Sequence, residues 1–156
     1  FNADDIFEMA EQIERNGAAF YRKAAAGIDD PENSKMLLDL AAMEDEHEKT
    51  FSGIRAQLTA EEREASVFDP EGEASLYLKA LADTRVFFEK TIDVTSMVSI
   101  LKEAITAEKD SIVFYLGMKD LVPEKFGKSR IDALIREEMA HIRLLSQELV
   151  AQKRGS

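Results

Sequence analysis

The two histidines of this chain each stand three residues after a glutamate. The pairs are Glu44 with His47 and Glu138 with His141. In a helix, a separation of three residues places both side chains on one face, one turn apart. Carboxylate and imidazole groups are ligands for divalent transition metals. Each pair is therefore a candidate for half of a metal site.

A further glutamate precedes each pair at the same distance. Glu14 lies 33 residues before His47, and Glu108 lies 33 residues before His141. The second triplet repeats the first after a shift of 94 residues, since 108 − 14, 138 − 44 and 141 − 47 all give 94. Six side chains of these types at this spacing are typical of a dinuclear metal site inside a four-helix bundle.

Chance accounts poorly for this pattern. Nineteen of the 156 residues are glutamate, so both histidines would follow a glutamate at this spacing in on the order of one such chain in a hundred. The alternative is that the glutamates are solvated and the histidines are ordinary core residues. Four unpaired glutamates in one core plane would, however, cost several kcal/mol each unless they took up protons or bound cations.

Apolar residues recur at helical spacing around each of these glutamates, and only three prolines and seven glycines interrupt the chain. We expect four long helices, over about residues 4–26, 31–59, 95–121 and 125–149. Asp4 or Asp5, Asp30 and Thr95 are the expected N-caps, with Pro31 in the first helical position.

The expected helices deliver the glutamates to one level. Glu14 and Glu44 each lie about 20 Å along their helices from the turn that joins them, at the helical rise of 1.5 Å per residue. Glu108 and Glu138 repeat this arrangement. The sequence therefore predicts an all-α bundle made of two repeated helical hairpins.

Residues 59–95 form the one long connection of the predicted bundle. A short helix is expected over 74–82, followed by an apolar segment at 86–88. A connection of this length allows a crossover from one end of the bundle to the other. A lid that packs on one end of the bundle is the alternative.

The repeat assigns a role to each predicted ligand. The six ligands are Glu14, Glu44, His47, Glu108, Glu138 and His141. By symmetry, each histidine binds a different ion, Glu44 and Glu138 are placed to bridge the two ions, and the remaining glutamates are terminal. A carboxylate-rich set with one imidazole per ion favours two iron ions, with manganese or zinc as alternatives.

Other residues near these ligands have less certain roles. Tyr21 and Tyr115 lie two turns from the terminal glutamates, where they could donate hydrogen bonds to a bridging carboxylate or simply be core tyrosines. Ser111, like Gly17, is small enough to leave room for solvent beside the site, or merely for close helix packing. Glu11 and Glu137 fall off the apolar stripes and are predicted to be solvated.

Composition limits the class of protein. A chain of 156 residues that is 45% hydrophobic and 33% charged predicts one globular domain over residues 1–156. A net charge of −11 argues against nucleic acid and anionic membranes as partners. The absence of cysteine excludes disulfides and thiolate metal sites. Since no apolar run is long enough to span a membrane, we expect a cytoplasmic protein.

At these residues the sequence resembles the ferritin-like di-iron carboxylate proteins, and more closely their rubrerythrin-like branch. The stretches that carry the resemblance are 14–21, 80–87, 108–115 and 138–142. The similarity covers essentially the whole chain and implies a ferritin-like four-helix bundle with a long crossover. It departs from full rubrerythrins in two ways. The chain has no cysteine-rich rubredoxin-like domain, and Ser111 stands where rubrerythrins place an extra glutamate, which argues against an unmodified rubrerythrin peroxidase cycle.

The resemblance implies an oxidoreductase of the peroxidase or ferroxidase type. Two ferrous ions would reduce hydrogen peroxide or dioxygen, as in defence against oxidative stress, and an external electron donor would restore them. One alternative is an iron-binding ferroxidase of iron homeostasis; another is a helical interaction module with a structural metal. We expect a homodimer, because the apolar segment 86–88 would need a partner surface.

Overall fold

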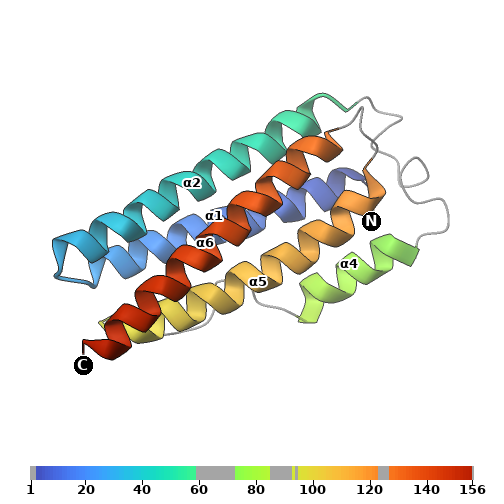
Figure 1. Cartoon of the computed structure of the whole chain (residues 1–156). Coiled ribbons are helices and arrows are strands. Elements are labelled where there is room, and N and C mark those ends of the chain that lie inside the picture. The colour runs from blue at the N-terminus through green and yellow to red at the C-terminus, as the bar shows by residue number, and fades with distance from the viewer. Residues whose placement is uncertain (1–2, 59–72, 85–92, 94, 123–126, 156) are drawn as a thin grey trace.

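The computed structural model describes residues 3–58, 73–84, 93, 95–122 and 127–155. Within these ranges the chain forms five helices (Figure 1). They are α1 (Ala3–Ala26), α2 (Pro31–Ala56), α4 (Glu73–Thr84), α5 (Met97–Leu121) and α6 (Lys128–Arg154). The predicted apolar segment at 86–88 lies outside the described residues. No helix among the described residues is both long and apolar enough to cross a membrane.

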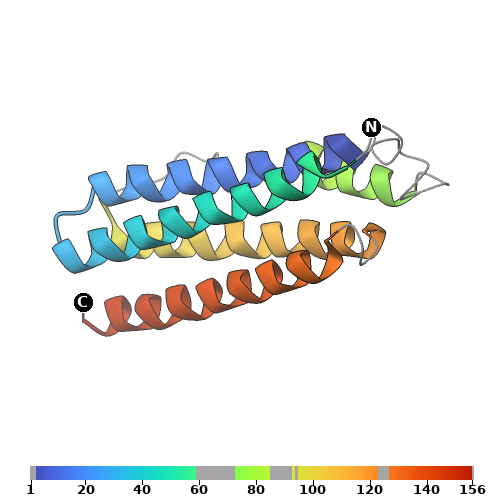
Figure 2. The same ribbon diagram turned by 90° about the horizontal axis from the view of Figure 1, so that it is seen from above.

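The four long helices form a bundle of two antiparallel hairpins, α1 with α2 and α5 with α6 (Figure 1). Seen from above, one hairpin lies over the other, so that α1 contacts α5 and α2 contacts α6 (Figure 2). The helix α2 ends at the end of the bundle opposite to the one where α5 begins. The connection between them therefore leads from one end of the bundle to the other, which confirms the predicted crossover.

The short helix α4 belongs to this connection and packs against α5 and α1. Leu78 of α4 is fully buried and lies over Gly117 of α5. A Cβ atom at Gly117 would lie 2.9 Å from Leu78 Cδ2, so the absence of a side chain permits the close approach. The helix predicted over 74–82 is thus present, one or two residues longer at each end.

Two of the three expected N-caps are shifted in the structure. Asp30 caps α2 as predicted, accepting a hydrogen bond of 3.0 Å from the Glu32 backbone N–H. By contrast, α1 already begins at Ala3, so the neighbouring aspartates lie in its first turn, where they favour the helix dipole. The cap of α5 is Ser96 rather than Thr95. Both residue types can cap a helix, and apolar periodicity does not resolve a shift of one residue.

The helix α6 begins after a glycine with a left-handed backbone. Gly127 has φ of 107°, and a Cβ atom there would lie 3.1 Å from Ile54 Cδ1 of α2. A residue with a side chain would be strained in this conformation and crowded against α2. The predicted start of this helix, near residue 125, lies outside the described residues. Its end is at Arg154, five residues beyond the expected position.

The interior of the bundle is apolar toward both ends and polar in the middle. Its largest fully buried side chains include Phe7, Phe51, Leu101, Phe114 and Met118. Burial of each such side chain contributes on the order of 1.5–3 kcal/mol. Between them lies a layer of buried glutamate, histidine and serine side chains. A polar layer at the centre of an apolar core is costly, and therefore indicates a functional site.

Candidate metal centre

Each of the four long helices contributes one buried glutamate to the central layer. They are Glu14 of α1, Glu44 of α2, Glu108 of α5 and Glu138 of α6, none of them more than 2% exposed. His47 and His141, each 3% exposed, follow one turn along α2 and α6. The structure thus brings all six predicted ligand residues together. That they bind metal remains a prediction.

The six side chains form two overlapping groups. The first is Glu14, Glu44, His47 and Glu138, and the second is Glu44, Glu108, Glu138 and His141. In each group, one ligand atom from every residue lies within 4.8 Å of the others. Glu44 and Glu138 belong to both groups. They therefore occupy the positions expected of bridging carboxylates, whereas Glu14 and Glu108 each belong to one group.

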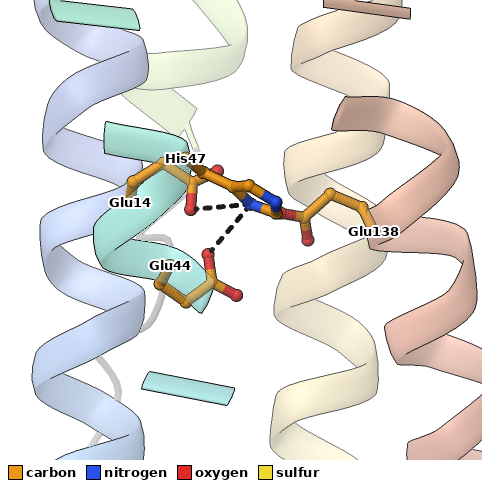
Figure 3. Close-up of side chains that lie close together, drawn as sticks. All are labelled: Glu14, Glu44, His47 and Glu138. Carbon is orange, nitrogen blue, oxygen red and sulfur yellow. Dashed lines mark hydrogen bonds and ion pairs between the residues drawn. The ribbon is translucent and has the colours of Figure 1, made fainter. Parts of the chain in front are cut away.

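The ring of His47 lies between carboxylates of both hairpins (Figure 3). Its Nδ1 atom is 2.8 Å from Glu138 Oε1, 3.5 Å from Glu14 Oε2 and 3.9 Å from Glu44 Oε2. The first of these atoms belongs to α6 and the other two to α1 and α2. The Nδ1 atom is therefore the one directed into the cluster, which makes it the candidate metal-binding nitrogen.

His141 has the equivalent surroundings at longer distances. Its Nδ1 atom is 3.7 Å from Glu108 Oε1, 3.8 Å from Glu44 Oε1 and 3.9 Å from Glu138 Oε2. The two imidazole rings stack with their centroids 5.8 Å apart and an angle of 19° between their planes. The near-parallel rings follow from the repeat, because each histidine leaves the same turn of its own helix.

The hydrogen-bonding capacity of the cluster is far from satisfied by the described residues. One oxygen from each of the four glutamates and both nitrogens of His141 are buried without a hydrogen-bond partner. Buried polar atoms are nearly always paired, and each exception costs on the order of 1–3 kcal/mol. Two divalent cations would bind the carboxylate oxygens and Nδ1 of His141, and would neutralise the four carboxylates. The residues present therefore fit a dinuclear metal site.

Burial and mutual repulsion change the protonation of the cluster. Burial, followed by the charges of Glu108 and Glu14, raises the pKa of Glu44 well above its usual range. Burial by itself would lower the pKa of His47, but hydrogen bonding and charge from Glu14 and Glu137 outweigh it and raise that pKa. Without metal, the cluster thus retains protons. A bound cation would replace them.

The two buried tyrosines connect α1 and α5 across the bundle. The Tyr21 hydroxyl donates to Glu108 Oε1 at 2.8 Å, and the Tyr115 hydroxyl donates to Glu14 Oε1 at 2.7 Å. Burial and these carboxylates raise the pKa of both phenols, so the phenols remain proton donors. Of the two alternatives left by the sequence, the tyrosines do donate to carboxylates of the cluster, but the acceptors are the predicted terminal glutamates and not the predicted bridging ones. Since α1 packs on α5, each tyrosine reaches the terminal glutamate of the neighbouring helix.

Two glutamates predicted to be solvated have defined contacts. Glu11 is only 4% exposed and accepts hydrogen bonds from the Ser52 hydroxyl and, at 2.6 Å, from Arg55. Glu137 is exposed, yet its Oε2 atom lies 2.5 Å from Nε2 of His47. The contact of Glu137 with His47 has one signal in the sequence, because Glu137 directly precedes Glu138 and its carboxylate can therefore reach the neighbouring helix α2.

The hydroxyl of Ser111 is directed at its own helix. It donates to the Ala107 carbonyl at 2.9 Å, and the residue is buried. Its polar group is therefore used by the backbone of α5 and adds no ligand to the cluster.

The structure is similar to a known one from Thermotoga maritima, provisionally described as a ferritin-like diiron-carboxylate protein. The two share 26% sequence identity, with a TM-score of 0.69, over 96% of this chain and 95% of the other. No protein-family model matches the sequence, and no curated protein does. The narrower rubrerythrin-like assignment thus remains a prediction. The shared fold, together with a buried cluster that is consistent with a dinuclear metal site, places this chain in the ferritin-like superfamily.

Proposed function

We propose that this protein is a di-iron carboxylate redox protein that reduces hydrogen peroxide or dioxygen, as rubrerythrin-like proteins do. The observation that carries the proposal is the pair of overlapping ligand groups that share Glu44 and Glu138. Sharing two carboxylates would hold two ions close together, which suits a reaction that needs two electrons at one place. The description of the similar Thermotoga maritima protein as diiron-carboxylate supports the same assignment.

Four carboxylates and two imidazoles favour iron or manganese over zinc, whose sites more often carry more nitrogen or sulfur. When bound, a ferrous pair supplies the two electrons by which H₂O₂ and two protons become two molecules of water. The anionic ligands favour the resulting higher charge on the metal. An external electron donor then restores the ferrous state.

The residues around the cluster position and shelter it. Tyr21 and Tyr115 each hold one oxygen of a terminal carboxylate, which fixes its orientation. Phe51 and Phe114, both fully buried, help to separate the cluster from bulk water. The apolar shell strengthens the electrostatic interactions within the cluster and limits loss of oxidant to side reactions.

Stopped-flow absorption tests the proposal. Anaerobic protein loaded with Fe(II) is mixed with hydrogen peroxide or dioxygen, and ferric absorption in the near ultraviolet is followed. We expect oxidation much faster than that of free Fe(II), and its loss in Glu44→Ala. Glu46→Ala is the matched control, since Glu46 is exposed two residues along the same helix. Oxidation no faster than that of free Fe(II) would refute the proposal.

Iron handling by a ferroxidase is the second candidate, and the net charge of −11, which attracts cations, favours it. In a ferroxidase, ferric iron leaves the protein after oxidation, whereas in a redox enzyme it stays and is reduced again. Counting iron after oxidation and gel filtration separates the two. The same gel filtration measures the mass, for which we propose a homodimer. A purely structural metal would instead give no reaction with either oxidant.

A further inference from the structure

The two halves of the metal centre differ at the positions that directly precede the two shared glutamates. Glu137 directly precedes the bridging Glu138, and the residue 94 positions earlier is Met43, which directly precedes the bridging Glu44. Both residues lie where a side chain can approach the histidine of the other hairpin. The repeat therefore supplies a carboxylate to one histidine and a thioether to the other.

Glu137 restrains His47. Its Oε2 atom lies 2.5 Å from Nε2 of the ring, on the side away from the carboxylate cluster. A carboxylate in this place holds the proton on Nε2, so that the lone pair of Nδ1 is directed into the group formed with Glu14 and Glu138. It also fixes the orientation of the ring and makes Nδ1 a stronger ligand.

His141 has no such restraint among the described residues. The residue is 3% exposed, and its Nε2 atom has no hydrogen-bond partner. The ring lines a pocket of about 360 Å³ between α2 and α6, to which Met36, Met43 and Leu144 contribute apolar walls. Met43 is itself 39% exposed. The pocket is also lined by the charged side chains of Glu32, Lys35 and Asp39, but none of the described residues forms a hydrogen bond with the buried Nε2 atom of His141.

We infer that the two ion positions are inequivalent: the position at His47 binds its ion more tightly, and the position at His141 is the one that exchanges. This inference depends on the proposed metal centre. Loss of a carboxylate partner from a metal-binding histidine typically costs 10- to 100-fold in affinity. We expect a difference of that order between the two positions.

Titration of metal-free, full-length protein with Zn(II), followed by calorimetry, tests the inference with a redox-inert probe. The wild type should bind two ions in separate steps. Glu137→Met should weaken the tight step about 10- to 100-fold and bring the two steps together, whereas Met43→Glu should strengthen the weak step. Glu137→Gln keeps a hydrogen-bond acceptor without the charge. Its affinity in the tight step should lie between those of the wild type and Glu137→Met. Glu46→Met controls for the loss of an exposed negative charge from the same region.

Nitrogen NMR of protein with labelled histidine identifies which position fills first. The chain has two histidines, so the imidazole spectrum is simple. The first equivalent of Zn(II) should shift Nδ1 of His47, and the second should shift Nδ1 of His141. Assignment uses the spectrum of Glu137→Met, in which only the His47 signal of the metal-free protein should move strongly.

The outcomes are distinguishable. Two ions bound with equal affinity, or His141 occupied first, would overturn the inference while leaving the metal centre intact. No binding of Zn(II), Mn(II) or Fe(II) would refute the metal centre and the inference together. Stepwise binding in a protein that reacts with neither oxidant would refute the proposed redox function alone.

Discussion

At the scale of single residues, the cluster is a set of carboxylates held by unequal contacts. Glu14 and Glu108 each accept a hydrogen bond from a tyrosine on the neighbouring helix, while Glu44 receives no such bond from either tyrosine. The carboxylates that belong to one ligand group are thus fixed by protein donors. Of the two carboxylates that belong to both groups, Glu138 instead has its Oε1 atom 2.8 Å from Nδ1 of His47, a side chain that would itself bind an ion.

Replacement of Tyr21 by phenylalanine should destabilise the metal-free protein. It leaves Glu108 Oε1, at 2.8 Å from the lost hydroxyl, without this donor in a site excluded from water. We expect a cost of about 1.5 kcal/mol, or roughly 4–5 °C in Tm. Thermal unfolding in chelator measures it, with Tyr77→Phe as the control, since Tyr77 is half exposed on α4. Equal losses in both variants would show that the contact with Glu108 contributes nothing.

The metal-free protein should become less stable as the pH rises from about 5 to about 8. The pKa of Glu44 is raised by burial and by Glu108 and Glu14, and the pKa of His47 is also raised. A group with a higher pKa in the folded state binds protons that the unfolded chain has released. The folded state is therefore favoured below the unfolded pKa and loses that advantage as the pH rises through the folded pKa.

Melting temperatures in chelator across this pH range check the direction. Glu44→Gln should show a shallower decline than the wild type, because glutamine cannot ionise. Glu46→Gln removes the same charge from an exposed position and should leave the slope nearly unchanged. If both variants had the same slope, net charge rather than the cluster would control the pH dependence.

At the scale of helices, the two hairpins are held together by different contacts at equivalent positions of the repeat. In the first hairpin, Arg55 of α2 donates to Asp4 at 2.7 and 2.9 Å and to Glu11 at 2.6 Å, both on α1. In the second hairpin, the positions equivalent to Glu11 and Arg55 are Ile105 and Leu149, which pack on the apolar core. One repeat thus uses ion pairs where the other uses apolar contact.

Arg55→Leu should therefore cost about 2 kcal/mol, because it leaves the buried carboxylate of Glu11 without its guanidinium. The double variant Glu11→Ile with Arg55→Leu copies the pair in the second hairpin and should recover most of the loss. Chemical denaturation of both variants measures the difference. A double variant that is no more stable than the single one would mean that the two hairpin ends are not interchangeable.

Helices and their order could be predicted because their signals are strong and local. Periodic apolar residues and the repeat after 94 residues predict four helices, and they predict that one glutamate from each helix lies at a common level of the bundle. The rotation of each helix about its axis is set by packing, which periodicity reports only coarsely. For this reason the acceptors of Tyr21 and Tyr115, the burial of Glu11 and the contact of Glu137 with His47 required the structure.

At the scale of the whole molecule, the cluster lies on the seam between the hairpins. Packing within each hairpin is far more extensive than packing between them. The seam also carries the buried carboxylates, which repel one another when they are ionised. Cations on the seam would convert this repulsion into attraction, so metal binding and the association of the hairpins should be coupled.

Metal should therefore raise the unfolding temperature. A ligand at a hundredfold excess over its Kd stabilises the folded state by about 2.7 kcal/mol, provided that it does not bind the unfolded chain. Calorimetric scans in chelator and in saturating Mn(II) or Zn(II) measure the shift. Glu44→Gln, which removes a ligand shared by both groups, should show a much smaller shift. An unchanged Tm in the wild type would contradict the coupling.

The division of ligands between the hairpins has a consequence for assembly. Each group takes three residues from one hairpin and its fourth from the other, Glu138 in the first case and Glu44 in the second. Neither hairpin alone can complete a coordination set. Separately expressed hairpins would thus behave as complementary fragments whose recombination is conditional on the ion. Metal concentration would then set whether two peptides become one protein.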